Sequence, residues 1–581
     1  MLRSAEVAGL NNLTGIAPRS QWIVFLSIST IALLVITFSM VMNQQFYKTH
    51  LSFSDGMGIY FSVGRTIQIA KTQGTLQALN FAVNSSMYIL HQIMAALLGP
   101  LLNLSMSVGP LFNGIWYLAM SVSLGLLFWD RTHSIVLSIL LSIPPMIYIS
   151  PVATAYEGLT NMNVDFLSYV LSVSTICYLL LSDNLSKSWA TILAGVFWGL
   201  LVLGRIPTAI LLGIMVMPLF IKGLIYHSTR SVVFRGLLIL GTTVLMVSGW
   251  WLIFSLYEFI KFFFFWYGHP LGSMGNLSPA RLPFLWKGFI RELIGNNIPY
   301  IGMTLWLSWI PGSVIIKGVN GISLLKQLNW IYIWMGISPL LILMLLHTEN
   351  LPYAFPAYMG FYLTLLFPFK QNPRERSILQ SKSYRMGLML MIIIASFWFV
   401  ITMYKQHTTP SFSKQTTLQI TQSILDDIYH QQADKDKQEF QISITYWGTL
   451  NRYSLANVFL FDKNQSVRMI GKQSESNLFK PSRPPILHIH SAVAWLDASD
   501  SDETHKAYLN KIVEEVENQS DYVIILSRES WNPKGSYPFS QFWSQWVKLS
   551  EQLLNSNRFH TLTLPLRITD SEWVVVLARS F

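Results

Sequence analysis

Long apolar runs without charged residues restrict the fold of this chain more than any other feature. The first run, residues 22–42, is WIVFLSISTIALLVITFSMVM, and about 20 such residues in a helix cross the hydrocarbon core of a bilayer. Because the run lacks a cleavage site of small residues, we expect a retained span and not a signal peptide. Further candidate spans follow at 86–104, 107–128, 134–150, 164–182, 189–204, 206–221, 234–256, 298–316, 328–346, 352–369 and 386–404. The pattern predicts a polytopic α-helical membrane protein with about 12 transmembrane helices, in which 189–221 forms one long helix or two short ones.

The placement of charge separates the chain into two parts. Only 12% of the residues are charged, about half the share of an average soluble domain. Residues 1–404 contain 22 basic and 10 acidic residues, whereas residues 405–581 contain 18 and 19. A basic excess confined to the apolar part indicates membrane topology and contacts with membrane lipids, and argues against nucleic acid as a partner. The single cysteine, Cys177, excludes a disulfide framework and a cysteine-based metal site.

Basic residues also predict the orientation of the spans. If the N-terminus is cytoplasmic, 14 of the 22 basic residues in 1–404 fall on the cytoplasmic side, and 370–385 is the densest cluster. This bias follows the positive-inside rule. With an even number of spans, residues 405–581 are then extracytoplasmic. We therefore expect a multi-pass protein of the cell inner (plasma) membrane whose C-terminal region is periplasmic.

Residues 405–581 are predicted to form a soluble extracytoplasmic α/β domain that follows a transmembrane domain, residues 1–404. Strand-like runs alternate there with helical patterns, which is typical of a small layered α/β domain. The region contains no glycine-rich phosphate loop and no nucleophile elbow, so its sequence does not indicate a catalytic site of its own. The strand-like runs are 441–447, 486–490, 521–526, 560–566 and 572–578, and the helical patterns are 415–430, 503–517 and 540–555.

Two loops on the predicted outer side are longer than plain connectors. Residues 44–85 contain amphipathic stretches that we expect to lie along the membrane surface. Asp55 lies in this loop, in LSFSDGMGIY, where it is either the N-cap of the following helix or a general base. The second loop, residues 257–297, is aromatic and basic. Its basic residues, which either form a phosphate clamp or bind lipid headgroups without specificity, are Arg281, Lys287 and Arg291.

Arg205 is a lone cation between two apolar runs, in GLLVLGRIPTAILLG. A long basic side chain at a membrane interface often snorkels, which keeps its charged head in water. A guanidinium can instead hold a lipid phosphate through two parallel hydrogen bonds, which lysine cannot reproduce. Both interpretations of Arg205 stay open at the level of sequence.

Four motifs occur in a fixed order between about residues 20 and 405. FSDGMG places Asp55 in the first outer loop, and YEGLTNMNVDFLSYVL (156–171) leads into a new span. A glycine-rich helix ends at Arg205-x-Pro-Thr, and a Tyr-x-x-Pro-x-Tyr element (353–358) lies near the last spans. In this order and sidedness the chain resembles the GT-C superfamily of integral membrane glycosyltransferases, and in particular the protein O-mannosyltransferases and the lipid A aminoarabinose transferases.

The resemblance implies a GT-C-like catalytic domain over residues 1–404. Members of the superfamily transfer one sugar, a hexose or a pentose, from a polyprenyl-phosphate donor on the outer face of the membrane, with inversion at the anomeric carbon. The acceptor here would be a glycan, a lipid or a protein. The acid of the first loop is the catalytic base in the superfamily, so Asp55 takes that role. Many members have a second acid beside it, whereas this chain has Gly56, which departs from the mannosyltransferases in particular.

The resemblance also implies further site residues. The superfamily often has an acid at the start of the span that matches 164–182, and of the aligned candidates only Asp165 carries a charge. Arg205 matches the basic residue after the glycine-rich helix, and it would join the basic residues of the second loop as a ligand of the donor phosphate. The candidate substrate-binding residues are Glu157, Asn161, Asn163, His269, Glu349 and Tyr353.

The chemistry of such a transfer suits these residue types. A hydroxyl acceptor needs a carboxylate that takes its proton, and arginine or lysine stabilises the departing phosphate. A lipid monophosphate leaving group does not require a metal, and His50, His91 and His269 are isolated in the sequence. We therefore expect no cofactor and no metal site.

Three other functions fit part of the pattern. A transporter or flippase for lipid-linked glycans suits the number of spans, and an Arg205 in the middle of one long membrane helix would favour it, but the spans otherwise lack charges near their centres. A polymerase or ligase of surface polysaccharide predicts paired arginines in a late outer loop, which only Arg281 and Arg291 approach. A scaffold that binds partners through residues 405–581 would need far fewer spans.

Overall fold

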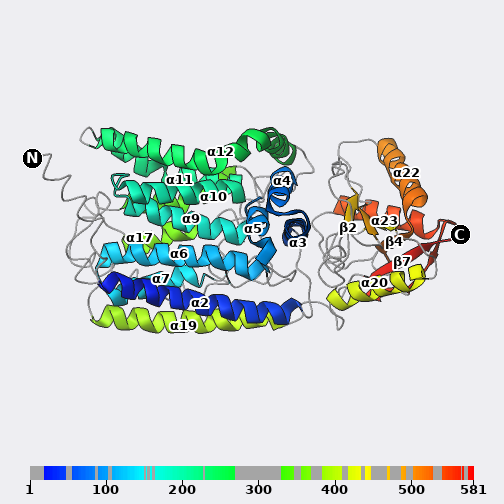
Figure 1. Ribbon diagram of the computed structural model, residues 1–581, viewed down its shortest axis with the longest axis horizontal. Coiled ribbons are helices and arrows are strands. Elements are labelled where there is room, and N and C mark those ends of the chain that lie inside the picture. The colour runs from blue at the N-terminus through cyan, green and yellow to red at the C-terminus, as the bar shows by residue number, and fades with distance from the viewer. Residues whose placement is uncertain are drawn as a thin grey trace, which may run out of the picture.

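The structure is a computed structural model, and it describes residues 19–47, 55–85, 89–101, 108–148, 152, 158–159, 162, 164–226, 229–268, 329–345, 355–367, 382–408, 417–433, 439–445, 467–470, 486–491, 502–527, 540–563, 565–567 and 573–580. Long helices lie side by side in a bundle, and a sheet with its own helices lies beyond one end of that bundle (Figure 1). We call this end of the bundle the sheet-side end. Three helices lie there (Figure 1): α3 (Asp55–Gln73), α4 (Thr75–Ser85) and α5 (Leu90–Leu98).

The other described helices of the bundle are mostly apolar, as their sequences predict. Helix α9 (Val164–Leu181) is fully buried along its whole length, and α6 and α10 pack against it. The described helices other than α3, α4, α5 and α9 are α2 (Arg19–Tyr47), α6 (Val108–Thr132), α7 (Ile135–Met146), α10 (Ser188–Gly204), α11 (Ile206–Ile225), α12 (Arg230–Gly268), α16 (Trp330–Leu345), α17 (Ala357–Leu366) and α19 (Lys382–Thr408); η1 (Gly99–Leu101) is a short 3-10 helix.

Glycines allow α10 and α12 to pack closely. A Cβ atom on Gly195 would lie 2.7 Å from Cβ of Thr243, and one on Gly199 would lie 2.6 Å from Cβ of Val247. Small residues four positions apart let the backbones of two apolar helices approach each other, which increases their van der Waals contact. The glycine-rich pattern before Arg205 therefore has a packing role in addition to any functional one.

Six helices within the described ranges are long and apolar enough to cross a membrane: α2, α6, α9, α11, α12 and α19. The expected total of twelve spans is not confirmed. The range 86–104 contains the shorter apolar helix Leu90–Leu101, which combines α5 and η1. The range 298–316 lies outside the described residues. The ranges 134–150, 189–204 and 328–346 coincide with apolar helices of 10–17 residues.

The structure answers whether residues 189–221 form one helix or two. Residues 189–221 form two helices, α10 and α11, and Arg205 between them has an extended backbone. Nε1 of Trp198 on α10 donates a hydrogen bond to the backbone oxygen of Ala209 on α11 (3.2 Å), so the two helices fold back on each other. The amphipathic stretch that begins at Asp55 forms α3, which packs against α5 and buries residues such as Tyr60 and Ile67 completely; its place along the membrane surface stays a prediction.

Residues 417–580 contain a seven-stranded mixed sheet in the order β2-β3-β1-β4-β7-β5, with β6 beside β7. The pairs β2–β3, β3–β1 and β1–β4 are parallel, and β7 is antiparallel to β4. The predicted runs form strands, except that 560–566 is divided between β5 and β6, and β2 was not predicted. The elements are α20 (Thr417–Ala433), β1 (Glu439–Ile444), β2 (Val467–Ile470), β3 (Ile486–Ser491), α22 (Asp502–Gln519), β4 (Tyr522–Leu526), α23 (Ser540–Leu554), β5 (Phe559–Thr561), β6 (Leu566–Arg567) and β7 (Trp573–Arg579).

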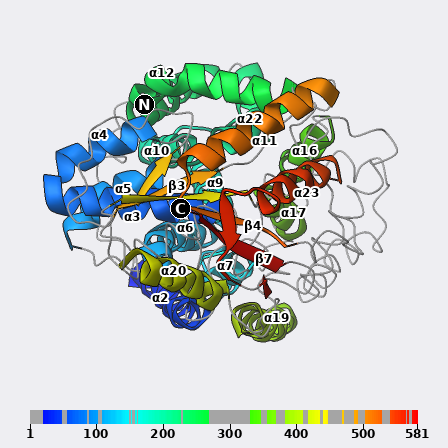
Figure 2. The ribbon, with the colours of Figure 1, turned by 90° about the vertical axis from the view of Figure 1, so that its right-hand side faces the viewer.

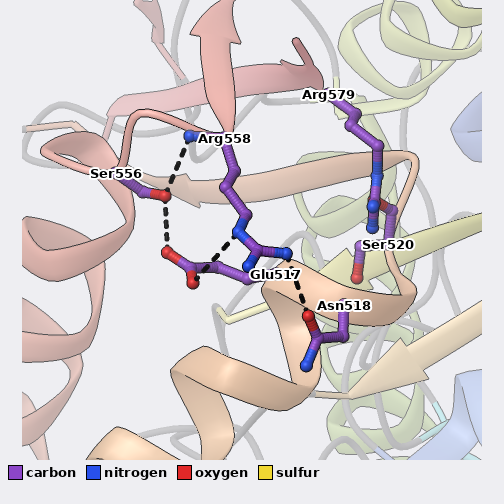
Figure 3. Close-up of polar contacts among 6 residues, drawn as sticks. All are labelled: Glu517, Asn518, Ser520, Ser556, Arg558 and Arg579. Atoms are coloured by element: carbon purple, nitrogen blue, oxygen red, sulfur yellow. Dashed lines mark hydrogen bonds and ion pairs between the residues drawn. The ribbon is translucent and has the colours of Figure 1, made fainter. Parts of the chain in front are cut away.

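Apolar side chains of α22 and α23 cover one face of this sheet, where they pack on β4 and β7. Helix α20 lies on the opposite side of the strands from α22 (Figures 1 and 2). Figure 3 shows how the end of α22 is tied to the segment before β5: the Glu517 carboxylate accepts a hydrogen bond from Ser556 Oγ (2.5 Å) and lies 3.9 Å from Nε of Arg558. Helices therefore cover both faces of the sheet, as the alternating pattern predicts.

Candidate active site

Asp55, the predicted base, is the first residue of α3. A carboxylate in the first turn of a helix is stabilised by the unpaired backbone N–H groups and by the helix dipole. The interpretations of Asp55 as the N-cap of this helix and as a general base both stay predictions. The described side chains of α3 begin at Gly58, so the position of the base is inferred from that of the helix.

Helix α3 is fixed against the starts of α6 and α9. Ile59, Tyr60 and Val63 share one apolar cluster with residues of α5, with Phe112 of α6 and with Val164 of α9. Gly109 of α6 touches the phenol of Tyr60 so closely that any side chain at Gly109 would collide with it. The helix that carries Asp55 is therefore held directly beside the segment that leads to Asp165.

Asp165 and Arg205 form an ion pair at this place. Asp165 lies in the first turn of α9, and Arg205 lies at the turn between α10 and α11. Their side chains are only 9% and 5% exposed. The sequence separated these residues by forty positions, and the structure brings the two candidates into contact.

The ion pair limits what Arg205 does in this state. A snorkelling arginine keeps its guanidinium in water, whereas the Arg205 side chain is buried in protein. Its charge is balanced by Asp165, because two opposite charges removed from water are stable only when they are paired. A donor phosphate would therefore have to compete with the Asp165 carboxylate for the guanidinium or add a second contact to it.

Most of the other predicted site residues fall on parts of the chain that are not described. In the motif that precedes α9, only Gly158, Leu159, Met162 and residues from Val164 onward are described. The predicted residues outside the described ranges are Glu157, Asn161, Asn163, His269, Arg281, Lys287, Arg291, Glu349 and Tyr353.

The second tyrosine of the Tyr-x-x-Pro-x-Tyr element is described and lies in an aromatic cluster. The ring of Tyr358 stacks on Tyr148 with their centroids 4.1 Å apart, and it lies parallel to Tyr362 at 6.0 Å. Tyr148 also contacts Tyr169 of α9. Tyr358 therefore joins α17 to the centre of the bundle, which is a packing role.

Sequence reasoning missed two buried polar groups near this site. Arg65 of α3 is 8% exposed, and its guanidinium lies 5.0 Å from the centre of the Phe81 ring of α4. His91 of α5 and Asn113 of α6 are fully buried and hydrogen-bonded to each other (3.1 Å). A polar residue at a buried position of an apolar helix was the available signal, but burial itself depends on the packing of the helices. Among the described residues, no group of three or more His, Cys, Asp or Glu side chains is placed to hold a metal ion.

Comparisons with known proteins give a limited result. No protein-family profile and no curated protein matches the sequence. The chain is similar to cryo-EM structures of the arabinofuranosyltransferase AftD from Mycobacteria: one aligns with 95% of this chain and 40% of that chain at 11% identity and a TM-score of 0.47. A mutant of AftD (R1389S, class 2) aligns with 94% and 41% at 11% identity and a TM-score of 0.45. This chain therefore spans less than half of the length of those proteins, and at these values the likeness assigns neither a family nor a function.

Proposed function

We propose that the chain is a membrane glycosyltransferase. It moves a single sugar, a hexose or a pentose, from a polyprenyl-phosphate donor to a hydroxyl group of a glycan, a lipid or a protein on the outer face of the inner membrane. The anomeric configuration is inverted, and Asp55 is the general base. Residues 405–581 are periplasmic in this proposal, and no metal or cofactor takes part.

One observation supports this proposal more than the others: three segments that are far apart in the sequence meet at the sheet-side end of the bundle. The helix that begins at Asp55 packs on the start of α9, and Asp165 at that start contacts Arg205. A transfer between a lipid phosphate and a hydroxyl needs an acid or base and a cation near each other and near a membrane surface. The helix that begins at Asp55 and the ion pair of Asp165 and Arg205 supply both kinds of group in this proposal.

Each residue has a defined task in the proposed reaction. The acceptor oxygen attacks the anomeric carbon while its proton passes to the Asp55 carboxylate. The bond between that carbon and the phosphate oxygen breaks, and polyprenyl phosphate leaves with the electron pair. Arg205 stabilises the phosphate after the phosphate has partly displaced Asp165 from the guanidinium. Attack from the side opposite to the leaving group produces the inversion.

The structure bears on the rival proposals. A flippase or transporter would be favoured by an arginine in the middle of one long membrane helix, but Arg205 lies at a turn between two helices. The polymerase or ligase proposal depends on Arg281 and Arg291, which lie outside the described residues. A scaffold would not need a buried ion pair beside a helix that begins with an acid.

The substitution Asp55→Asn tests the proposal. Asparagine keeps the size of the side chain and can still accept a hydrogen bond at the start of α3, but it cannot take a proton. We expect transfer of radiolabelled sugar from undecaprenyl- or dolichyl-phosphate hexoses and pentoses into envelope acceptors to fall by about 10²- to 10⁴-fold, with an unchanged unfolding temperature.

Asp130→Asn is the matched control. Asp130 forms an exposed pair with Lys187 (3.6 Å) at the other end of α6, so its loss should leave transfer unchanged. Near-normal transfer by the Asp55 variant would exclude Asp55 as the base. Failure of the wild-type protein to release polyprenyl phosphate from any of these donors would reject the transferase itself.

A further inference from the structure

A second polar contact, separate from the ion pair, crosses the helices at the sheet-side end. His91 of α5 and Asn113 of α6 are both 0% exposed, and Nε2 of His91 lies 3.1 Å from Oδ1 of Asn113. Nδ2 of Asn113 donates a hydrogen bond to the backbone oxygen of Leu159 (3.2 Å). The contact thus joins two helices to the segment that precedes α9.

The donors and acceptors of this contact follow from the Leu159 carbonyl. A carbonyl oxygen only accepts, so the atom of Asn113 that faces it is the amide nitrogen. The Asn113 oxygen therefore faces His91, and Nε2 of His91 must carry the hydrogen. His91 is then a donor at Nε2. Its Nδ1 is buried without a hydrogen-bond partner among the described residues, so Nε2 is the only ring atom that makes the contact.

The segment held by this contact leads directly into the candidate active site. The Leu159 amide donates to the backbone oxygen of Val152 (3.1 Å), and Leu159 is fully buried. Met162, three residues later, belongs to the apolar cluster that holds α3, and Asp165 follows in the first turn of α9. A shift of the Leu159 backbone would therefore move both the start of α9 and the surface on which α3 packs.

A hydrogen-bonded pair is not required to fill a buried site between helices. Two apolar residues of similar shape would pack at these positions with little loss of stability, and a buried polar pair instead fixes one arrangement because its atoms have few alternative partners. We propose that His91 and Asn113 are positioning residues: they hold the backbone of Leu159 so that Asp165 and the helix of Asp55 keep their places for sugar transfer. This inference rests on the proposed function for its catalytic consequence, but not for the anchoring itself.

Hydrogen exchange tests the anchoring without any need for activity. In His91→Leu, we expect the Leu159 amide, which donates to the backbone oxygen of Val152, to exchange about 2- to 12-fold faster, which corresponds to the loss of one hydrogen bond, while α10 exchanges as before. His91→Gln should restore slow exchange, because the Gln amide nitrogen can replace Nε2, and the lost Nδ1 has no hydrogen-bond partner within the described part of the chain. Unchanged exchange of the Leu159 amide in His91→Leu and in Asn113→Leu would overturn the anchoring.

Kinetics then test the consequence for catalysis. With undecaprenyl-phosphate hexose or pentose as the donor, we expect kcat of His91→Leu to fall by about 10- to 100-fold, as a small misplacement of a site does, with little change in KM and recovery in His91→Gln. Tyr362→Phe is the control: it removes a buried hydrogen bond to the backbone oxygen of Leu141 (2.9 Å) that ties α17 to α7. It should lower the unfolding temperature similarly and leave kcat unchanged.

The possible results separate the two proposals. Faster exchange with wild-type kcat and KM would overturn the positioning role while leaving the transferase in place. Faster exchange in a protein whose wild-type form shows no transfer from any polyprenyl-phosphate donor would support the anchoring and reject the proposed function. An equal fall of kcat in Tyr362→Phe would show a general effect of stability and would also overturn the positioning role.

Discussion

The ion pair between Asp165 and Arg205 provides the most demanding test of the structure. Both side chains are less than 10% exposed, so the substitution of one leaves the other charged and removed from water. Breaking such a pair from one side costs about 3–5 kcal/mol, which is a large fraction of the 5–15 kcal/mol that stabilises an ordinary domain. We therefore expect Asp165→Asn and Arg205→Gln each to lower the unfolding midpoint strongly.

The double variant tests whether the two charges stabilise the protein as a pair or independently of each other. Asp165→Asn combined with Arg205→Gln leaves two neutral amides that can bond to each other, so it should be more stable than either single variant. The matched control is the exposed pair of Asp130 and Lys187, with side chains 38% and 41% exposed, for which Asp130→Asn should cost about 0–1 kcal/mol. The free energy of unfolding of each purified variant, measured in detergent by tryptophan fluorescence, gives the double-mutant cycle. If the loss of unfolding free energy in the double variant equals the sum of the losses in the two single variants, the buried pair is refuted.

The same variants test the competition between Asp165 and the donor phosphate. If the carboxylate and the phosphate share the guanidinium, Asp165→Asn should tighten the binding of a polyprenyl phosphate. Arg205→Gln should weaken that binding by about 10- to 150-fold, the value of a hydrogen bond to a charged group. Arg205→Lys should recover only part of it, because an ammonium lacks the planar two-point contact. Wild-type affinity in Arg205→Gln would end the assignment of Arg205 as a phosphate ligand.

Three other outcomes follow from the packing and the charge pattern. Gly199→Ala should destabilise the protein by about 1–3 kcal/mol through overpacking. Gly241→Ala on α12, where a Cβ meets nothing within 4 Å, should be neutral or stabilising by up to about 1 kcal/mol. Thermal unfolding of the two variants measures this difference. Gly109→Ala should push Tyr60 aside. We expect it to lower kcat while the unfolding temperature changes little. A reporter fused after Phe581 should be extracytoplasmic. If a reporter that is active only in the cytoplasm is active at this position, the predicted topology is reversed.

The sequence determined the helices and strands because their signals are local. Apolar runs such as 164–182 and 206–221 need only their own length and composition to form helices, and they coincide with α9 and α11. The runs 441–447 and 521–526 form β1 and β4 for the same reason. β2 was missed because its four residues give too short a pattern, and it becomes a strand by pairing with β3.

The sequence identified some residues of the candidate site, but it did not show how they are arranged. Asp55, Asp165 and Arg205 could be selected because charges are rare in an apolar chain. Nothing local states that Asp165 and Arg205 touch, since the contact depends on α10 and α11 folding back beside α9. The sequence equally allowed one long helix through Arg205, which would have placed this charge elsewhere.

Only the tertiary structure decided which polar residues are buried together. His91 and Asn113 are 22 positions apart, and each alone is an ordinary polar residue within an apolar helix. Their contact exists because α3, α5, α6 and the start of α9 bury one common apolar cluster, and burial removes water as an alternative partner. Hydrophobic pattern is a property of the neighbours in sequence, whereas desolvation and pairing are properties of the neighbours in space. The sequence therefore determined most of the elements, and the packing decided what their charges and hydrogen-bonding groups meet.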